Sequence, residues 1–167
     1  MAEPAAPDYR NSHFEFPILS KVIGEPDYKQ LLCIQKELKA NAQSVHSTLG
    51  GGAHGYLGLL TSLIQYSLVS HVPFVIPAFP GPLVIPLNTT NHMTFTLQQG
   101  HRNSVRIFRE CKAIQKALKQ QLVQAILKVY LESLRDSITN MIDRPIRGII
   151  QHLFDTYGNV TSQKIAG

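Results

Sequence analysis

Residues 40–101 contain no Asp, Glu, Lys or Arg, although 16% of the whole chain is charged. Charged side chains keep a protein surface solvated, because burying one away from water costs several kcal/mol. A segment of this length without them must be covered by the rest of its own fold or by other molecules. This charge-free segment limits what the chain can fold into more than any other feature.

The longest apolar run in the segment, VPFVIPAFPGPLVIPL at Val72–Leu87, does not fit a membrane-spanning helix. Such a helix needs about 20 apolar residues with every backbone hydrogen bond satisfied. The run contains five prolines, each of which lacks an amide donor and clashes with the preceding helical turn. We therefore expect a long, extended, proline-rich loop and no membrane contact.

The remaining charges are distributed unevenly along the chain. Residues 102–167 carry eleven basic and five acidic side chains, which could face an anionic partner such as nucleic acid. Cys33 and Cys111 are the only cysteines, and both lie in helical apolar patterns, as expected of reduced thiols. The N-terminal sequence lacks the features of a signal peptide. These observations favour a cytoplasmic or nuclear protein.

The spacing of apolar residues predicts an all-α fold, with about five to six helices in one domain. Apolar residues recur at three- and four-residue steps in most of the chain outside the loop. Residues 1–26 hold four prolines without a sustained period, so we expect a flexible N-terminal arm followed by a helical domain over 27–167. Helices are expected over residues 27–47, 56–70, 89–100, 102–127, 129–140 and 145–157.

The predicted helix over 102–127 has two opposite faces. Its apolar residues share one side, and its basic residues lie about 180° away at 100° per residue. We call the basic set the basic stripe, and it is the best candidate for contacts with nucleic-acid phosphates: Arg102, Arg106, Arg109, Lys112, Lys116 and Lys119. Aromatic residues do not alternate with these cations, so any contact would be to the backbone of RNA. The alternative is an ordinary solvated helix face.

Residue patterns typical of enzymes are absent. The stretch GGGAHGYLG at residues 50–58 lacks the Gly-Lys-Ser/Thr of a phosphate-binding loop, which favours a helix-breaking turn over an anion site. No HExxH, zinc-type Cys/His spacing or GxSxG occurs in the sequence. We expect no catalytic residues, no metal, no cofactor and no small-molecule substrate.

Three phrases of the sequence line up with one known family. They are QKELKANAQSVHSTLGGGAHGYLGLL at 35–60, ALKQQLVQAI at 117–126 and HLFDTYGNVTSQKI at 152–165. In order and spacing they resemble the N-terminal Gag region of Copia-type LTR retrotransposon polyproteins. That region typically ends in a segment matched here by His152, Leu153, Thr156, Tyr157, Gly158, Val160 and Thr161.

The resemblance implies a helical, capsid-like domain that self-associates into a particle around element RNA. It departs from the family in one respect, because a Gag usually continues into a CCHC zinc knuckle and no such motif follows Tyr157.

Three functional hypotheses remain open from the sequence. The first is a self-associating structural protein, whose subunit contacts come from the charge-free segment because large apolar surfaces mark interfaces. The second is a monomeric nucleic-acid-binding or regulatory module that uses the basic stripe. The third is a small enzyme with the glycine turn as an anion site. For the first hypothesis, the candidate contact residues are Tyr56, Leu59, Leu63, Phe74, Ile76, Phe79, Leu83 and Ile85.

Overall fold

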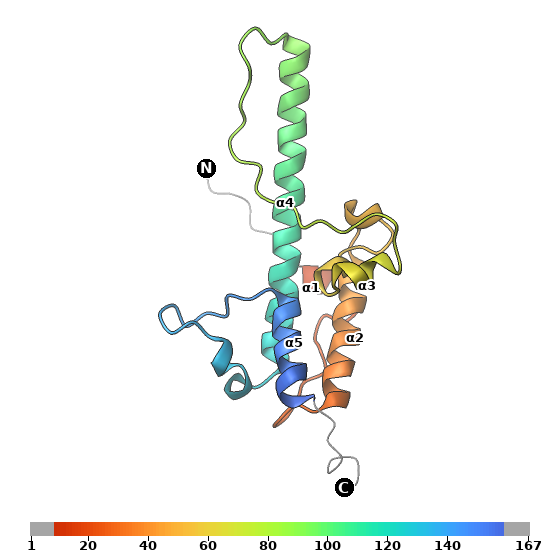
Figure 1. The fold of residues 1–167 in the computed structure, drawn as a ribbon, viewed down its shortest axis with the longest axis vertical. Helices are drawn as coiled ribbons and strands as arrows, with labels where there is room; N and C mark the ends of the chain where they lie inside the picture. Colours follow the sequence, from red (N-terminus) through yellow and green to blue (C-terminus); the bar gives the residue numbers. More distant parts are fainter. Residues whose placement is uncertain (1–8, 159–167) are drawn as a thin grey trace.

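The computed structural model of the chain describes residues 9–158 (Figure 1). This part is all-α: it contains no β-strand, only an isolated bridge between Arg135 and Ile142. Three helices, α2 (Tyr28–Ser44), the C-terminal half of α4 (Asn91–Ala125) and α5 (Ile146–Tyr157), lie side by side and enclose the core. The all-α prediction is confirmed for these residues.

Local signals explain where α2 and α5 begin and end. Asp27 caps α2 by accepting a hydrogen bond from the Gln30 amide, and the Gln30 side chain accepts one from the Asp27 amide in return. Pro145 precedes α5, and the Gly158 amide ends it by bonding to the Phe154 carbonyl. Both helices bury one apolar face, which consists of Leu31, Ile34, Leu38 and Ala42 in α2 and Ile146, Ile149, Ile150 and Leu153 in α5.

The longest helix, α4, runs without a break through Gly100. Thr90 caps it by accepting a hydrogen bond from the Met93 amide. The sequence predicts two separate helices here, over residues 89–100 and 102–127, and the structure joins them into one. A single glycine costs a helix only about 1 kcal/mol relative to alanine, which the hydrogen bonds of the flanking turns outweigh.

Two predicted helices are wrong in extent. Residues 56–70 form a short 3-10 turn, η2 (Leu57–Leu59), and a short helix, α3 (Leu63–Ser67), because Ser62 makes a capping box with Gln65 and starts a new helix. Residues 129–140 form 3-10 turns, η3 (Lys128–Tyr130) and η4 (Glu132–Leu134), and then a loop. In that loop the Asp136 carboxylate accepts hydrogen bonds from the Ile138 and Thr139 amides.

The glycine turn is a left-handed corner that lies against the core. Gly50, Gly51 and Gly52, which form η1 (Leu49–Gly51) and its C-cap, all have positive φ. The buried Tyr66 hydroxyl donates a 2.7 Å hydrogen bond to the Gly50 carbonyl. A Cβ at position 50 would lie 2.2 Å from that hydroxyl oxygen, so this corner requires glycine for packing as well as for conformation.

Part of the expected N-terminal arm packs against the core. After the short helix α1 (Tyr9–Ser12), residues 14–22 run in an extended path along α2 and α4, and Phe14, Leu19 and Val22 are buried in the core. We call residues 14–22 the N-terminal strap. The expectation for residues 1–8 lies outside the part of the chain that the structure describes.

Candidate self-association surface and basic helix face

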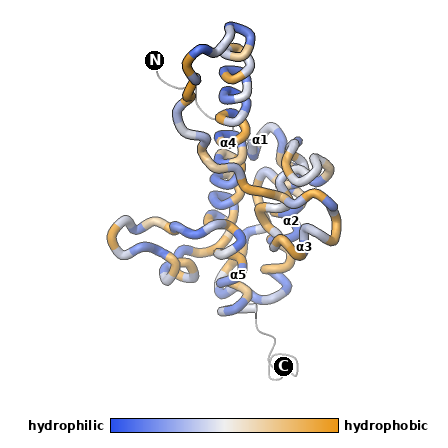
Figure 2. Tube along the Cα trace, turned by 45° about the horizontal axis from the view of Figure 1, so that its top comes forward, coloured by the Kyte–Doolittle hydropathy of each residue, from blue (hydrophilic) through white to orange (hydrophobic). Residues whose placement is uncertain are grey.

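The N-terminal half of α4 stands clear of the core. Figure 1 shows this half of the helix rising above the other elements, with the chain that precedes it running alongside. We call residues 75–108 the projection, which consists of the extended segment 75–90 and the first half of α4. Figure 2 shows stretches of hydrophobic residues along it. The projection is therefore the part of the charge-free segment with the least cover from the chain's own fold.

Few contacts hold the two sides of the projection together. The ring of Phe79 packs edge-on against Phe108, with centroids 5.5 Å apart. The His101 Nε2 lies 2.7 Å from the Gly81 carbonyl, and Thr89 donates a hydrogen bond to the Pro86 carbonyl close to the tip. An open pocket also lies at the tip, between residues 86–89 and the first turns of α4.

The projection exposes large apolar side chains on both of its sides. Ten of them are between 36% and 94% exposed: Val75, Ile76, Phe79, Leu83, Val84, Ile85, Leu87, Met93, Phe95 and Leu97. None of them has a charged neighbour before Arg102, because residues 75–101 carry no charge. Single exposed apolar residues are normal on a protein surface, but here ten of them lie within residues 75–97.

The structure divides the eight predicted contact residues into two groups. Tyr56, Leu59 and Phe74 are at most 5% exposed and belong to the core, so the folded chain does not offer them to a partner. Leu63, in α3, is 69% exposed. The other four lie in the projection and are exposed: Ile76, Phe79, Leu83 and Ile85.

The three buried residues support the base of the projection. The Phe74 ring packs against both Tyr56 and Tyr66, and a Cβ at Gly58 would lie 2.1 Å from its Cγ. The Tyr56 hydroxyl donates a 3.0 Å hydrogen bond to Glu110 on α4. Burial and the Glu110 carboxylate raise the pKa of Tyr56, so this hydroxyl keeps its proton.

Sequence reasoning missed part of the exposed set. Six residues are exposed but were not predicted contact residues: Val75, Val84, Leu87, Met93, Phe95 and Leu97. A helix periodicity places Met93 and Leu97 on one face, which by itself predicts burial against a core. Only the position of this half of α4, above the rest of the molecule, shows that no core is there (Figure 1).

The basic stripe lies on the face of α4 opposite the core, as predicted. Arg102, Arg106, Arg109, Lys112 and Lys116 are exposed, whereas Lys119 is half-buried and donates a hydrogen bond to the Ile142 carbonyl. Arg106 forms an ion pair with Glu110 at 3.3 Å, and the Lys112 ammonium lies over the Phe108 ring. The stripe begins in the projection and continues along the part of α4 that packs on the core.

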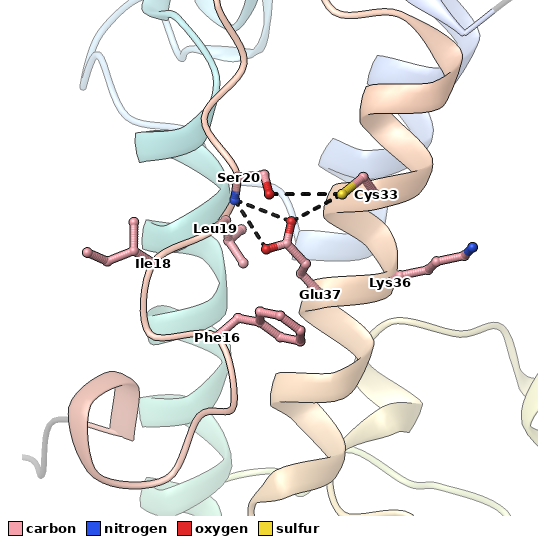
Figure 3. A pocket seen from close by; sticks show the side chains of 7 residues that line it. All are labelled: Phe16, Ile18, Leu19, Ser20, Cys33, Lys36 and Glu37. Atoms are coloured by element: carbon pink, nitrogen blue, oxygen red, sulfur yellow. Dashed lines mark hydrogen bonds between the residues drawn. The ribbon is translucent and has the colours of Figure 1, made fainter.

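A second open pocket, of about 490 Å³, lies between the N-terminal strap and α2 (Figure 3). The Glu37 carboxylate, only 7% exposed, accepts hydrogen bonds from the Ser20 amide, and the Cys33 thiol donates one to it at 3.4 Å. Cys33 itself is exposed, and its Sγ lies 4.0 Å from the Ser20 hydroxyl oxygen. These groups hold the strap in place.

Residues 9–158 contain neither a metal-ligand cluster nor a membrane-spanning helix. No group of three or more His, Cys, Asp or Glu side chains is placed to hold a metal ion. None of the helices described here is both long and apolar enough to cross a membrane.

Comparisons with known proteins add no family assignment. The chain matches no protein-family model, no curated protein and no solved structure. The function must therefore be argued from the sequence and from this structure.

Proposed function

We propose that this chain is a structural protein of the capsid-like, Gag type, which self-associates through the projection. The observation that carries the proposal is the set of ten exposed apolar side chains within residues 75–97, a charge-free part of the projection that stands clear of the core. The resemblance of residues 35–60, 117–126 and 152–165 to Copia-type Gag regions points to the same function.

The amount of exposed apolar surface supports an interface. With the exposed fractions given above, the ten side chains leave on the order of 1,000 Å² of apolar surface in water. The largest apolar patch of a typical monomer covers about 300–600 Å². A stable protein interface buries about 800 Å² on each partner. Two projections packed together would cover an area of that size.

The absence of charge favours another copy of the chain as the partner. An interface without charged groups offers no electrostatic attraction to an acidic or basic protein, so its partner must be equally apolar. The same segment of a second copy meets this condition. Because identical surfaces meet around a twofold axis, contacts between two projections would be self-complementary. The net charge of +5 lies outside residues 75–101 and does not oppose this approach.

Light scattering after size-exclusion chromatography, over a range of protein concentrations, tests the proposal. We expect oligomers whose mass rises with concentration. Phe95→Glu should shift the protein strongly toward monomer, because Phe95 is 59% exposed in the projection and a charge there resists burial. Gln124→Glu is the matched control, because Gln124 is an exposed residue of the same helix beside the core.

A monomer at all concentrations would overturn the proposal. Equal effects of Phe95→Glu and Gln124→Glu would also overturn the assignment of the interface to the projection.

A second proposed activity is RNA binding through the basic stripe, supported by its five exposed cations on one helix face. Binding to RNA phosphates weakens with salt, with a slope of about −0.7 per contacted phosphate for single strands. We expect Arg102→Gln with Lys116→Gln to weaken binding and reduce this slope, in filter-binding assays at several salt concentrations. Lys29→Gln, an exposed position on α2, should change neither. Equal RNA affinity and salt dependence in the two variants would show that the basic stripe is an ordinary solvated surface.

A further inference from the structure

The N-terminal strap lies in a groove whose polar groups recognise its backbone. Asn41 pairs with Phe16 in both directions: the Phe16 amide donates to Asn41 Oδ1 at 2.7 Å, and Asn41 Nδ2 donates to the Phe16 carbonyl at 2.9 Å. Gln121 Nε2 donates to the carbonyls of Phe16 and Pro17, both at 2.9 Å. These contacts involve backbone atoms of the strap alone.

Further along the strap, the same kind of contact recurs. The Ser20 amide donates to the Glu37 carboxylate at 3.2 Å (Figure 3). The Val22 amide donates to the Ala125 carbonyl at 2.9 Å. All of the groove's partners come from α2 and α4. The groove therefore holds an extended chain much as a sheet edge holds a strand, with side chains replacing most of the neighbouring strand's backbone groups.

The buried polar groups of the groove have the strap as a hydrogen-bond partner. Glu37, Asn41 and Gln121 are three of the five buried polar residues in the described part of the chain, and each bonds to the strap. Asn41 Nδ2 also donates to Gln121 Oε1, which joins the two side chains across the groove. An empty groove would leave these groups without their partners and expose the sites of Phe14, Leu19 and Val22.

The link between the strap and α2 is little constrained by packing. Ile23 is 84% exposed, Glu25 is exposed, and Gly24 has a positive φ with nothing within 4 Å of the position of a Cβ. Of the four linking residues, Pro26 is buried. A hinge of this kind can open without disturbing the core on either side of it.

We propose that the groove between α2 and α4 is an interaction site for the strap of a second copy, so that neighbouring subunits exchange residues 14–22. The exchanged strap makes the same backbone contacts as the strap of the groove's own chain. Because α1 precedes the strap and packs on α4, the exchange opens residues 23–26 and also moves α1 to the second copy. This inference rests on the proposed self-association, because copies held together by their projections raise the local concentration of straps.

Cys33 provides a direct test, because its Sγ lies 4.0 Å from the Ser20 hydroxyl oxygen across the groove. One protein is the unchanged chain, which carries a thiol in its groove and none on its strap. The other combines Ser20→Cys with Cys33→Ser, which moves the thiol to the strap. The two are unfolded, refolded together at a concentration where oligomers form, and oxidised. Exchange predicts a covalent dimer of the two proteins, with the disulfide between position 20 of one and Cys33 of the other by mass spectrometry.

The matched control combines Ile18→Cys with Cys33→Ser. Ile18 lies on the same strap, but its side chain is 86% exposed and points away from Cys33 (Figure 3), so this mixture measures crosslinking by random collision. A short bifunctional thiol reagent can replace oxidation in this experiment, because it joins two thiols that are too far apart for a disulfide. No mixed dimer above the Ile18 control, in a sample that scatters as oligomers, would overturn strap exchange alone. A sample that stays monomeric would overturn exchange together with the proposed function.

Discussion

At the scale of single residues, two glycines of this chain have opposite roles. Gly58 lies so close to Phe74 that a Cβ there would stand 2.1 Å from the Phe74 Cγ. Gly100 lies in the middle of α4, where a Cβ would meet nothing within 4 Å. The first glycine is required by packing at the base of the projection, and the second only weakens a helix.

These surroundings predict opposite effects of alanine. Gly58→Ala should lower the free energy of unfolding by about 1–3 kcal/mol, because the Phe74 ring must move from its site against Tyr56 and Tyr66. Gly100→Ala should raise it by up to about 1 kcal/mol, because alanine favours the exposed helix. Urea unfolding followed by circular dichroism measures both. Equal effects of the two substitutions would contradict the packing described for Phe74.

The two cysteines should differ in reactivity. Burial, with a contribution from Glu110, raises the pKa of Cys111 to about 11, whereas the Cys33 side chain is exposed. A thiol-specific chromogenic reagent at neutral pH should therefore titrate one thiol in the folded monomer and two after unfolding, because the thiolate is the reactive form. Rapid labelling of Cys111 in the folded chain would contradict its burial.

The same pKa predicts how stability changes in alkali. The ordinary thiol pKa is 9.0, and folding raises that of Cys111. Below pH 9 the thiol is protonated in both states. Between pH 9 and 11 only the unfolded state loses this proton, so the free energy of unfolding falls as pH rises. Tyr56, whose pKa is also raised by burial, acts in the same direction. Urea unfolding from pH 8 to 11 measures this fall, and stability unchanged over that range would contradict it.

At the scale of elements, two buried amides join the strap, α2 and α4. Asn41 is fully buried and makes hydrogen bonds to Phe16 and Gln121. Asn41→Ala should lower the free energy of unfolding by about 2–4 kcal/mol, since it leaves buried groups on both neighbours unpaired. Gln124→Ala, at an exposed position, should change it by less than about 0.5 kcal/mol.

The same contact predicts that the two amides act together. The double variant Asn41→Ala, Gln121→Ala should lose less free energy of unfolding than the sum of the losses in the two single variants. Both substitutions remove the same hydrogen bond, from Asn41 Nδ2 to Gln121 Oε1. Denaturant unfolding of the four proteins measures this coupling. Strict additivity would show that the two amides support the strap independently.

The helix starts that were predicted correctly are those with local signals. Asp27, Thr90 and Pro145 mark the starts of α2, α4 and α5, and the spacing of their apolar residues shows the buried face. The segments 56–70 and 129–140 also have apolar residues at helical spacing, but they form short turns. Local hydrogen bonds interrupt both segments: Ser62 bonds with Gln65, and Asp136 accepts from the Ile138 and Thr139 amides. The spacing of apolar residues does not reveal these interruptions, because the residues that make them are polar.

At the scale of the whole molecule, α4 joins a supported half to an unsupported one. Residues 111–125 pack on α2 and α5, with Ile114, Leu118 and Leu122 fully buried. Among the described residues, 91–106 rise above the other helices and run alongside the segment before α4 (Figure 1). The two halves of one helix therefore belong to regions of different local stability.

Hydrogen exchange should show this difference. In dilute, monomeric protein the amides of residues 95–106 should exchange much faster than those of residues 111–125, because opening the projection exposes little core. Raising the concentration until oligomers form should slow exchange in residues 95–106, and the Phe95→Glu variant should not show this slowing. Equal protection of both halves in the monomer would contradict the separation of the projection from the core.

The sequence by itself determined the helical class, the caps and faces of the long helices, and the presence of a charge-free segment that needs cover. These properties depend on residues close together in the chain. Only the tertiary structure decided which members of that segment are covered. Tyr56, Leu59 and Phe74 lie against the core, whereas Ile76, Phe79, Leu83 and Ile85 lie on the projection. Both sets consist of large apolar or aromatic residues, and they differ in burial because burial depends on which distant elements pack beside a residue.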